Sequence, residues 1–79
     1  MLYLIGRKRA DAMLGLARQD DEAKVVLIHE GVYLATPGLR DVYAVKADVE
    51  RLGVRPQAKI IDDGELVALI LQNKVVSHT

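Results

Sequence analysis

Short apolar runs recur along the chain and are separated by longer mixed segments. The runs cover residues 2–5, 25–28, 42–45, 58–61 and 75–76. All of the runs except 58–61, which Lys59 interrupts, are continuous. A strand with one face in water would instead alternate apolar and polar residues. The pattern therefore predicts five short strands that are buried on both faces, which is typical of a parallel sheet.

The connections between these runs are too long for tight hairpins. In chain order, 18 residues separate Ile5 from Lys24, 12 separate His29 from Val42, 11 separate Lys46 from Ala58 and 13 separate Ile61 from Val75. A parallel crossover needs about a dozen. Strands that alternate with crossovers of this length predict an α/β fold, in which helices cover both faces of a mainly parallel sheet. We expect a three-layer α/β/α sandwich with four to five strands, formed by one domain over residues 1–79.

The first three connections carry helix signals. In the first, apolar residues at positions 10, 13, 14 and 17 share one helical face, and Gly15 weakens that helix by up to about 1 kcal/mol. The second has room for one or two helical turns over residues 31–36, before Pro37 and Gly38. The third predicts a short helix over residues 47–52 that ends at Gly53.

The last connection has the clearest helix start. Asp62 and Glu65 have the spacing of a capping box. Large aliphatic residues then wrap most of the helix circumference, and a helix that is apolar all round is buried on more than one side. In so small a chain one of those sides is expected to face another subunit. The residues predicted to face an oligomer partner are Leu66, Leu69 and Ile70.

Composition points toward assembly as well. Half of the chain is apolar (51%), which is enough for a core. A domain of this size nevertheless buries only about 60% of its unfolded surface, and such domains are usually stabilised by disulfides, metals or oligomerisation. The chain has no cysteine, and His29 and His78 are not in a metal-ligand spacing. By elimination, we expect oligomerisation and no metal or other cofactor.

Charge excludes some partners. Acidic and basic residues balance at 11 each, so the chain as a whole has no electrostatic attraction to nucleic acid or to an anionic membrane. No apolar stretch approaches the roughly 20 residues of a membrane-spanning helix, and the opening residues lack the order of a signal peptide. We therefore expect a cytoplasmic protein that binds neither nucleic acid directly nor a membrane.

The best candidate for a ligand site lies where the first two strands end. Arg7, Lys8 and Arg9 follow the first strand, and His29 and Glu30 follow the second. Ligands of open α/β sheets bind outside the carboxyl ends of the strands, so these residues could bind an anion or an acidic partner. A solvated basic loop and a structural histidine are the simpler interpretations, because neither a P-loop nor a GxGxxG motif is present.

Other polar groups give no assembled chemistry. Ser77 and His78 are adjacent, and neighbouring residues of a strand point to opposite faces. The acidic run over residues 20–22 is expected to be a solvated turn, and the three tyrosines are too few for a nucleic-acid stacking platform. No cofactor fingerprint, metal set or catalytic triad can be assembled, so we do not expect an enzyme.

Four stretches resemble one family. They are MLYLI at the start, VVLIHEGVYLA over residues 25–35, VYAVKADVERLGV over 42–54, and ELVALILQNKVVSHT at the end. In order and spacing the chain resembles the DsrE/DsrF/DsrH superfamily, most closely the DsrH/TusB branch. The second stretch resembles a family turn with an acid followed by Gly-Val-Tyr, so Gly31 and Tyr33 join the candidate edge. The chain departs from the family pattern at Glu30, where Asp is common, and at His78, where an aromatic residue is usual.

The resemblance implies a sulfur relay. In that family a DsrE/TusD-type subunit carries a persulfide on a cysteine, and a DsrH/TusB-type subunit packs beside it in a heterotrimer that doubles to a hexamer. The complex serves tRNA wobble-uridine 2-thiolation or sulfur oxidation. A chain without cysteine cannot hold a persulfide. The resemblance therefore implies a non-catalytic subunit, with its last strand beside its first.

Two alternatives remain beside this hypothesis. The chain could form a stand-alone homo-oligomer that serves as a scaffold of the same fold. It could also bind a small anionic ligand at the carboxyl edge of the sheet. On connection lengths alone, a flavodoxin-like strand order fits as well.

Overall fold

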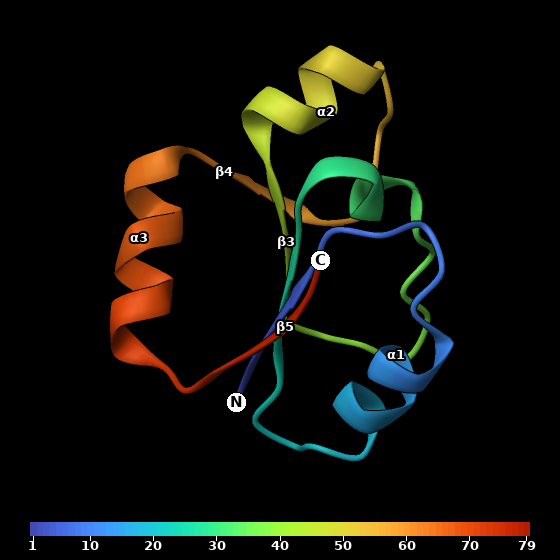
Figure 1. Cartoon of the computed structure of the whole chain (residues 1–79), viewed down its shortest axis with the longest axis vertical. Coiled ribbons are helices and arrows are strands. Elements are labelled where there is room, and N and C mark those ends of the chain that lie inside the picture. The colour runs from blue at the N-terminus through green and yellow to red at the C-terminus, as the bar shows by residue number, and fades with distance from the viewer.

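The computed structural model describes all 79 residues. Five strands alternate with three α-helices and one 3₁₀ helix (Figure 1). In chain order the elements are β1 (Leu2–Ile5), α1 (Asp11–Arg18), β2 (Lys24–Leu27), η1 (His29–Tyr33), β3 (Val42–Val45), α2 (Lys46–Leu52), β4 (Lys59–Ile61), α3 (Asp63–Gln72) and β5 (Val75–His78).

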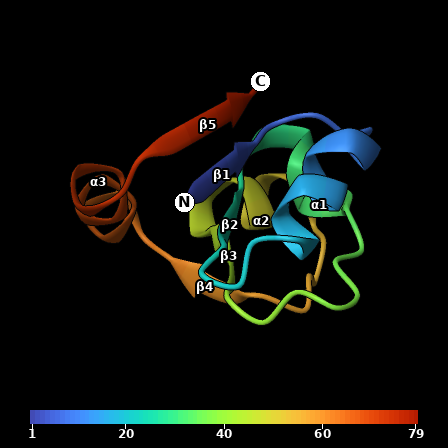
Figure 2. The same ribbon diagram turned by 90° about the horizontal axis from the view of Figure 1, so that it is seen from below.

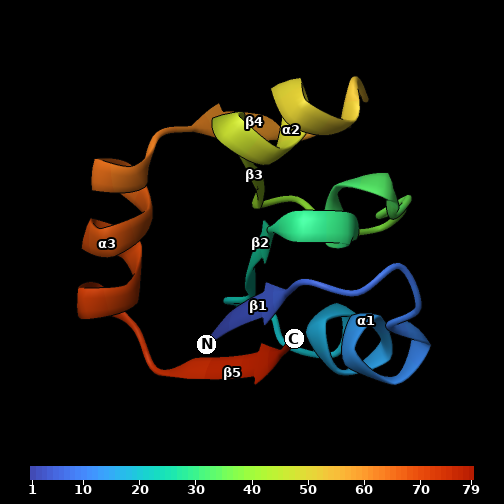
Figure 3. The ribbon, with the colours of Figure 1, turned by 45° about the horizontal axis from the view of Figure 1, so that its top comes forward.

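The strands form one sheet in the order β4-β3-β2-β1-β5 (Figure 3). Every neighbouring pair is parallel, as the continuous apolar runs predicted. The first strand lies between the second and the last, so Leu2 is in register with Lys24 on one side and Val75 on the other. This order confirms that the last strand pairs with the first, and it differs from a flavodoxin-like order.

The helices lie in two layers on opposite sides of the sheet, with α3 alone on one side and α1, η1 and α2 on the other (Figures 2 and 3). Right-handed crossovers explain this division. The chain steps from β1 to β4 in one direction across the sheet, so its first three connections lie on one face. The fourth connection returns from β4 to β5 in the opposite direction and crosses the other face. The predicted three-layer sandwich is confirmed.

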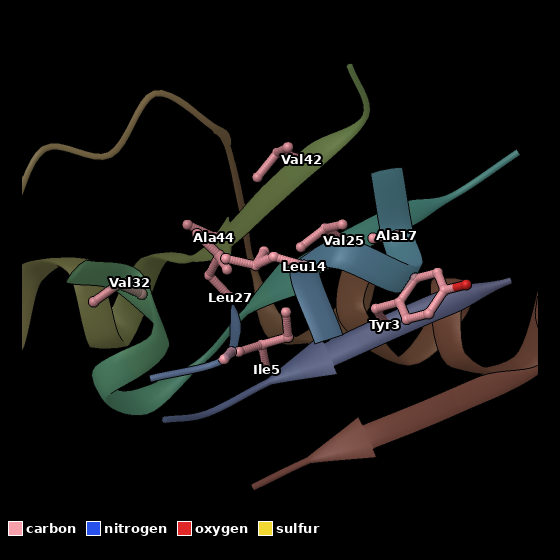
Figure 4. Close-up of a cluster of buried hydrophobic side chains, with 10 residues drawn as sticks. Tyr3, Ile5, Leu14, Ala17, Val25, Leu27, Val32, Val42 and Ala44 are labelled. Carbon is pink, nitrogen blue, oxygen red and sulfur yellow. The ribbon is translucent and has the colours of Figure 1, made fainter. Parts of the chain in front are cut away.

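The core beneath α1 is the larger of two (Figure 4). It holds ten buried residues, and α2 adds partly buried Val49 and Leu52 to it. The ten are Tyr3, Ile5, Ala10, Leu14, Ala17, Val25, Leu27, Val32, Val42 and Ala44. Ala17 lies on the buried side of α1 and buried Ala10 directly precedes the helix. Side chains this small let the helix lie close to the strands.

The core beneath α3 is smaller. Its four buried residues all come from the sheet: Leu2, Val26, Val45 and Ile61. From α3, only Leu66 and Leu69 pack against them, and both are partly exposed. No residue of α3 is buried.

Helix ends follow the sequence signals closely. The Asp62 carboxylate accepts a hydrogen bond from the Glu65 N–H at 2.8 Å, and the reciprocal bond of the capping box is present at 3.5 Å. Gly53 ends α2 with φ of +66°, in the left-handed region that glycine adopts at little cost. Helix α2 begins at Lys46, one residue before the predicted start.

Four predicted elements need corrected boundaries. The helical segment expected over residues 31–36 is a 3₁₀ helix over His29–Tyr33, because the Gly31 N–H bonds to the Ile28 carbonyl directly after the strand. The last strand runs two residues further, to His78, because it pairs with β1 along its whole length. Strand β4 begins at Lys59, not at residue 58, and β2 is shifted by one residue to Lys24–Leu27.

Candidate functional site

The carboxyl ends of β5, β1 and β2 meet at one edge of the sheet. There they border an open depression of about 680 Å³. Its lining contains no hydrophobic residue and consists of Gly6, Arg7, Lys8, Arg9, His29, Glu30, His78 and Thr79. We call this feature the carboxyl-edge depression. It brings together the five charged and histidine residues predicted from the first two strand ends.

Besides Gly6, sequence reasoning missed His78 and Thr79 at the C-terminal end of the last strand. The apolar run of the last strand stops at Val76, so the strand was not expected to extend to this edge. Pairing of His78 with Ile5 carries it there. The family resemblance implied that the last strand lies beside the first. That signal could have placed both residues at this edge.

The last strand holds the basic loop in position. The Gly6 N–H donates to the His78 carbonyl at 2.9 Å. The Arg7 Nε–H donates to the main-chain oxygen of Thr79 at 3.0 Å, and the His78 Nε2 lies 3.1 Å from the Arg9 carbonyl. The first and third of these contacts hold the backbone of residues 6–9 at its two ends, and the second orients the Arg7 side chain.

His29 is held by its backbone. Its φ is +49°, which is uncommon outside glycine although histidine tolerates it better than most residues. Its N–H donates to the Asp48 carboxylate at 2.8 Å, and that carboxylate also accepts from the Arg51 guanidinium at 3.1 Å. Partial burial alone would raise the pKa of Asp48, but these two bonds outweigh it and lower the pKa.

Lys8 and Glu30 face each other across the depression. Their charged atoms lie 3.7 Å apart, and both side chains are more than half exposed. Exposed ion pairs of this kind contribute about 0–1 kcal/mol to stability. The pair therefore leaves both side chains free to exchange partners.

Gly31 and Tyr33 lie outside the depression. Gly31 is buried, and a Cβ atom there would overlap the Ile5 carbonyl oxygen, so only glycine lets η1 approach the end of β1. Tyr33 is half exposed and lines a separate hollow of about 380 Å³ with residues 54–57. Gly31 is thus explained by packing, and Tyr33 is not brought to the basic loop.

Helix α3 presents a second candidate surface. Leu66 and Leu69 are turned toward the sheet, so of the three residues predicted to face a partner only Ile70 is on the open side. Val67 is 54% exposed, Ile70 37% and Leu71 80%. We call these three residues the α3 outer surface. Val67 and Leu71 were not predicted, because apolar residues all round the helix did not show which side packs on the sheet.

The acidic turn lies at the opposite, amino-terminal edge of the sheet. Asp20 accepts hydrogen bonds from the Glu22 N–H at 3.0 Å and the Tyr3 hydroxyl at 3.1 Å, and the Met1 amino group lies 3.3 Å away. The first of these bonds is the main cause that lowers the pKa of Asp20. Burial and the neighbouring Asp20 raise the pKa of Tyr3. Asp20 thus ties β1 to the turn before β2.

No three histidine or carboxylate side chains lie close enough together to form a metal site. None of the helices has the length and apolar character needed to cross a membrane. The chain matches no protein-family model, and no curated protein is significantly similar to it.

Proposed function

We propose that this chain is a non-catalytic subunit of a sulfur-relay complex, and that the α3 outer surface packs against a cysteine-bearing partner of the same fold. The observation that carries the assembly part is the exposure of an aliphatic stretch of α3. Residues 66–71 contain five large aliphatic side chains, and α3 buries none of them.

Burial of the α3 outer surface would supply a substantial driving force. Full burial of a Val, Leu or Ile side chain stabilises by about 1.5–3 kcal/mol. Val75 is a further exposed apolar residue on this side of the sheet, because it pairs with Leu2 of the α3-side core and is 38% exposed at the open edge of the sheet. Exposed apolar surface, where it is contiguous, marks protein interaction sites.

The sulfur-relay part rests on the sequence resemblance. It is supported by the five-stranded parallel sheet with the last strand beside the first, which the resemblance implied. The chain has no thiol, so the persulfide would belong to the partner. The product pathway would be tRNA wobble-uridine thiolation or sulfur oxidation.

The test is affinity purification of the tagged chain from its source, followed by native mass spectrometry. We expect a stoichiometric complex with a cysteine-containing protein of similar size. Val67→Glu with Leu71→Glu should abolish this complex, because two carboxylates would be buried without partners. Leu16→Glu is the matched control, since Leu16 is an exposed (56%) aliphatic residue of α1, on the other side of the sheet.

A second measurement separates assembly from sulfur chemistry. The partner is loaded with radioactive sulfur, and transfer to its acceptor is followed with and without this chain. Transfer that depends on wild-type chain and fails with the Val67→Glu, Leu71→Glu variant supports the relay. A discrete homo-oligomer with no second protein contradicts the proposed partner and favours the stand-alone scaffold.

A further inference from the structure

The carboxyl-edge depression concentrates positive charge on a chain that is neutral overall. Arg7, Lys8 and Arg9 line it, and Glu30 is the only acidic side chain among its eight lining residues. The chain as a whole has 11 acidic and 11 basic residues. The local excess of base at the end of the sheet where α/β ligands bind therefore needs an explanation.

The residues at the floor of the depression are tightly packed. A Cβ atom on Gly6 would lie 3.1 Å from the Thr79 methyl group and 3.5 Å from the His29 ring. The glycine thus lets the ends of three neighbouring strands close together. His29 begins η1 shortly after β2, and His78 ends β5, and β2 and β5 are the two strands that flank β1. Both histidines line the depression together with the basic loop.

The cationic groups are available for a ligand. The Arg7 guanidinium uses its Nε–H for Thr79, which leaves its terminal N–H groups free. The Arg9 side chain makes no ion pair or hydrogen bond, and Lys8 makes only the 3.7 Å contact with Glu30. Because the last strand fixes the loop backbone, part of the ordering cost of a binding site is met before a ligand arrives.

We infer that the carboxyl-edge depression binds a small molecule that carries a phosphate-type oxyanion, with Arg7 and Arg9 as its principal donors. A guanidinium matches the oxygens of a tetrahedral anion with paired hydrogen bonds. A volume of about 680 Å³ falls in the range of about 300–1,000 Å³ typical of small-molecule sites, which leaves room for an organic group on the phosphate. Side chains supply the contacts here, because no glycine-rich loop precedes α1.

This inference goes beyond the proposed function and does not depend on it. The depression is formed by the ends of β5, β1 and β2, whereas the α3 outer surface lies on the far side of α3 from the sheet. Failure of one proposal would therefore leave the other standing.

The test is a titration of the isotope-labelled full chain followed by amide chemical shifts, at constant ionic strength. One arm uses inorganic phosphate and the other uses glycerol 3-phosphate. We expect saturable shifts at residues 6–9, His29 and His78. Arg7→Ala with Arg9→Ala should weaken binding at least tenfold, which corresponds to about 1.4 kcal/mol.

Two further variants control the titration. Arg40→Ala with Arg55→Ala removes the same charge from exposed positions outside the depression, and should leave the affinity unchanged. Arg9→Gln alone keeps the contact between Arg7 and Thr79, and should still weaken binding. Tighter binding of glycerol 3-phosphate identifies an organic phosphate as the ligand, and equal binding identifies the free anion. No saturable shift in either arm, or equal loss in the control variant, would overturn the inference.

Discussion

The two faces of the sheet are covered very differently. On one face α1, η1 and α2 share a core of ten buried residues, and Leu14 and Ala17 of α1 are 4% and 1% exposed. On the other face α3 lies alone over four buried residues, and none of its own side chains is buried. Two helices of similar length in one small chain therefore differ in how far their apolar sides are removed from water.

The difference follows from size. Five strands spaced about 4.8 Å apart make a sheet about 20 Å wide, and one helix with its side chains is about 10–12 Å across. A single crossover helix cannot cover that width, whereas three helical segments can. The α3 face is thus left incomplete by the topology, and the proposal that another subunit covers it would account for its aliphatic composition. A helix buried only within its own chain would have polar residues on its outer side.

The largest expected effect is a difference in stability between two variants, one on each face of the sheet. Leu14→Ala removes a buried side chain beneath α1 and should lower the free energy of unfolding by about 2–5 kcal/mol. Leu71→Ala, at an 80% exposed position of α3, should change it by no more than about 0.5 kcal/mol in the isolated chain. Urea denaturation of both variants measures the contrast, and equal losses would show that the two faces are packed alike.

The second largest effect is expected for Gly31→Ala, which should lower the free energy of unfolding by about 1–3 kcal/mol or more. The added methyl group would overlap the Ile5 carbonyl oxygen and force η1 away from β1 on the well-covered face. Thermal unfolding followed by circular dichroism measures the loss. Gly64→Ala, where the nearest atom lies at 3.4 Å, is the control on the α3 face, and a loss as large as that of Gly31→Ala would contradict this explanation.

Removal of the α3 cap should cost less. Asp62→Ala deletes the acceptor for the Glu65 N–H and should destabilise the chain by about 0.5–2 kcal/mol. Because α3 is held by few packed side chains, we expect its amide exchange to increase more than that of α1. Hydrogen exchange read by mass spectrometry measures both helices. Uniform acceleration would mean that α3 opens only with the whole fold.

One substitution on the face covered by α1 is expected to increase stability. A Cβ atom on Gly15 would meet nothing within 4 Å, so Gly15→Ala should stabilise α1 by about 0.5–1 kcal/mol. The melting temperature should rise accordingly. A fall would show that the helix needs the glycine for a contact that its backbone alone does not reveal.

The smallest effect concerns pH. The pKa of Asp48 is lowered in the folded chain, so the unfolded chain binds more protons below neutrality. The stability that Asp48 contributes is therefore present above its unfolded pKa, near 3.9, and is lost as the pH falls through the folded value. Asp48→Asn should flatten this acid loss, and unfolding measured from pH 6 to about pH 3 tests it. An unchanged slope would show that other carboxylates carry the dependence.

The fold was largely predictable because all but one of the apolar runs are continuous and each crossover is long. The start of α3 and the end of α2 could also be predicted from the sequence. Asp62 and Glu65 act through local hydrogen bonds, and Gly53 acts through its own φ. The extension of β5 to His78 was not, because Ser77 and His78 become part of a strand only by pairing with β1.

The site was predictable in part for the same reason. Arg7, Lys8, Arg9, His29 and Glu30 could be grouped because parallel strands end at a common edge. Which side of α3 faces outward depends on its rotation over the sheet, and five aliphatic residues around the helix do not encode that rotation. Leu66 and Leu69 therefore had to be distinguished from Val67 and Leu71 by the structure.

The proposal that a partner covers the α3 face is tested most directly by hydrogen exchange of α3. The exchange is measured in the isolated chain and in the purified complex. In the isolated chain we expect the amides of residues 63–72 to exchange faster than those of residues 11–18. In the complex the protection of α3 should rise markedly, with little change in α1. Unchanged protection of α3 upon assembly would contradict the proposal that a partner covers this face.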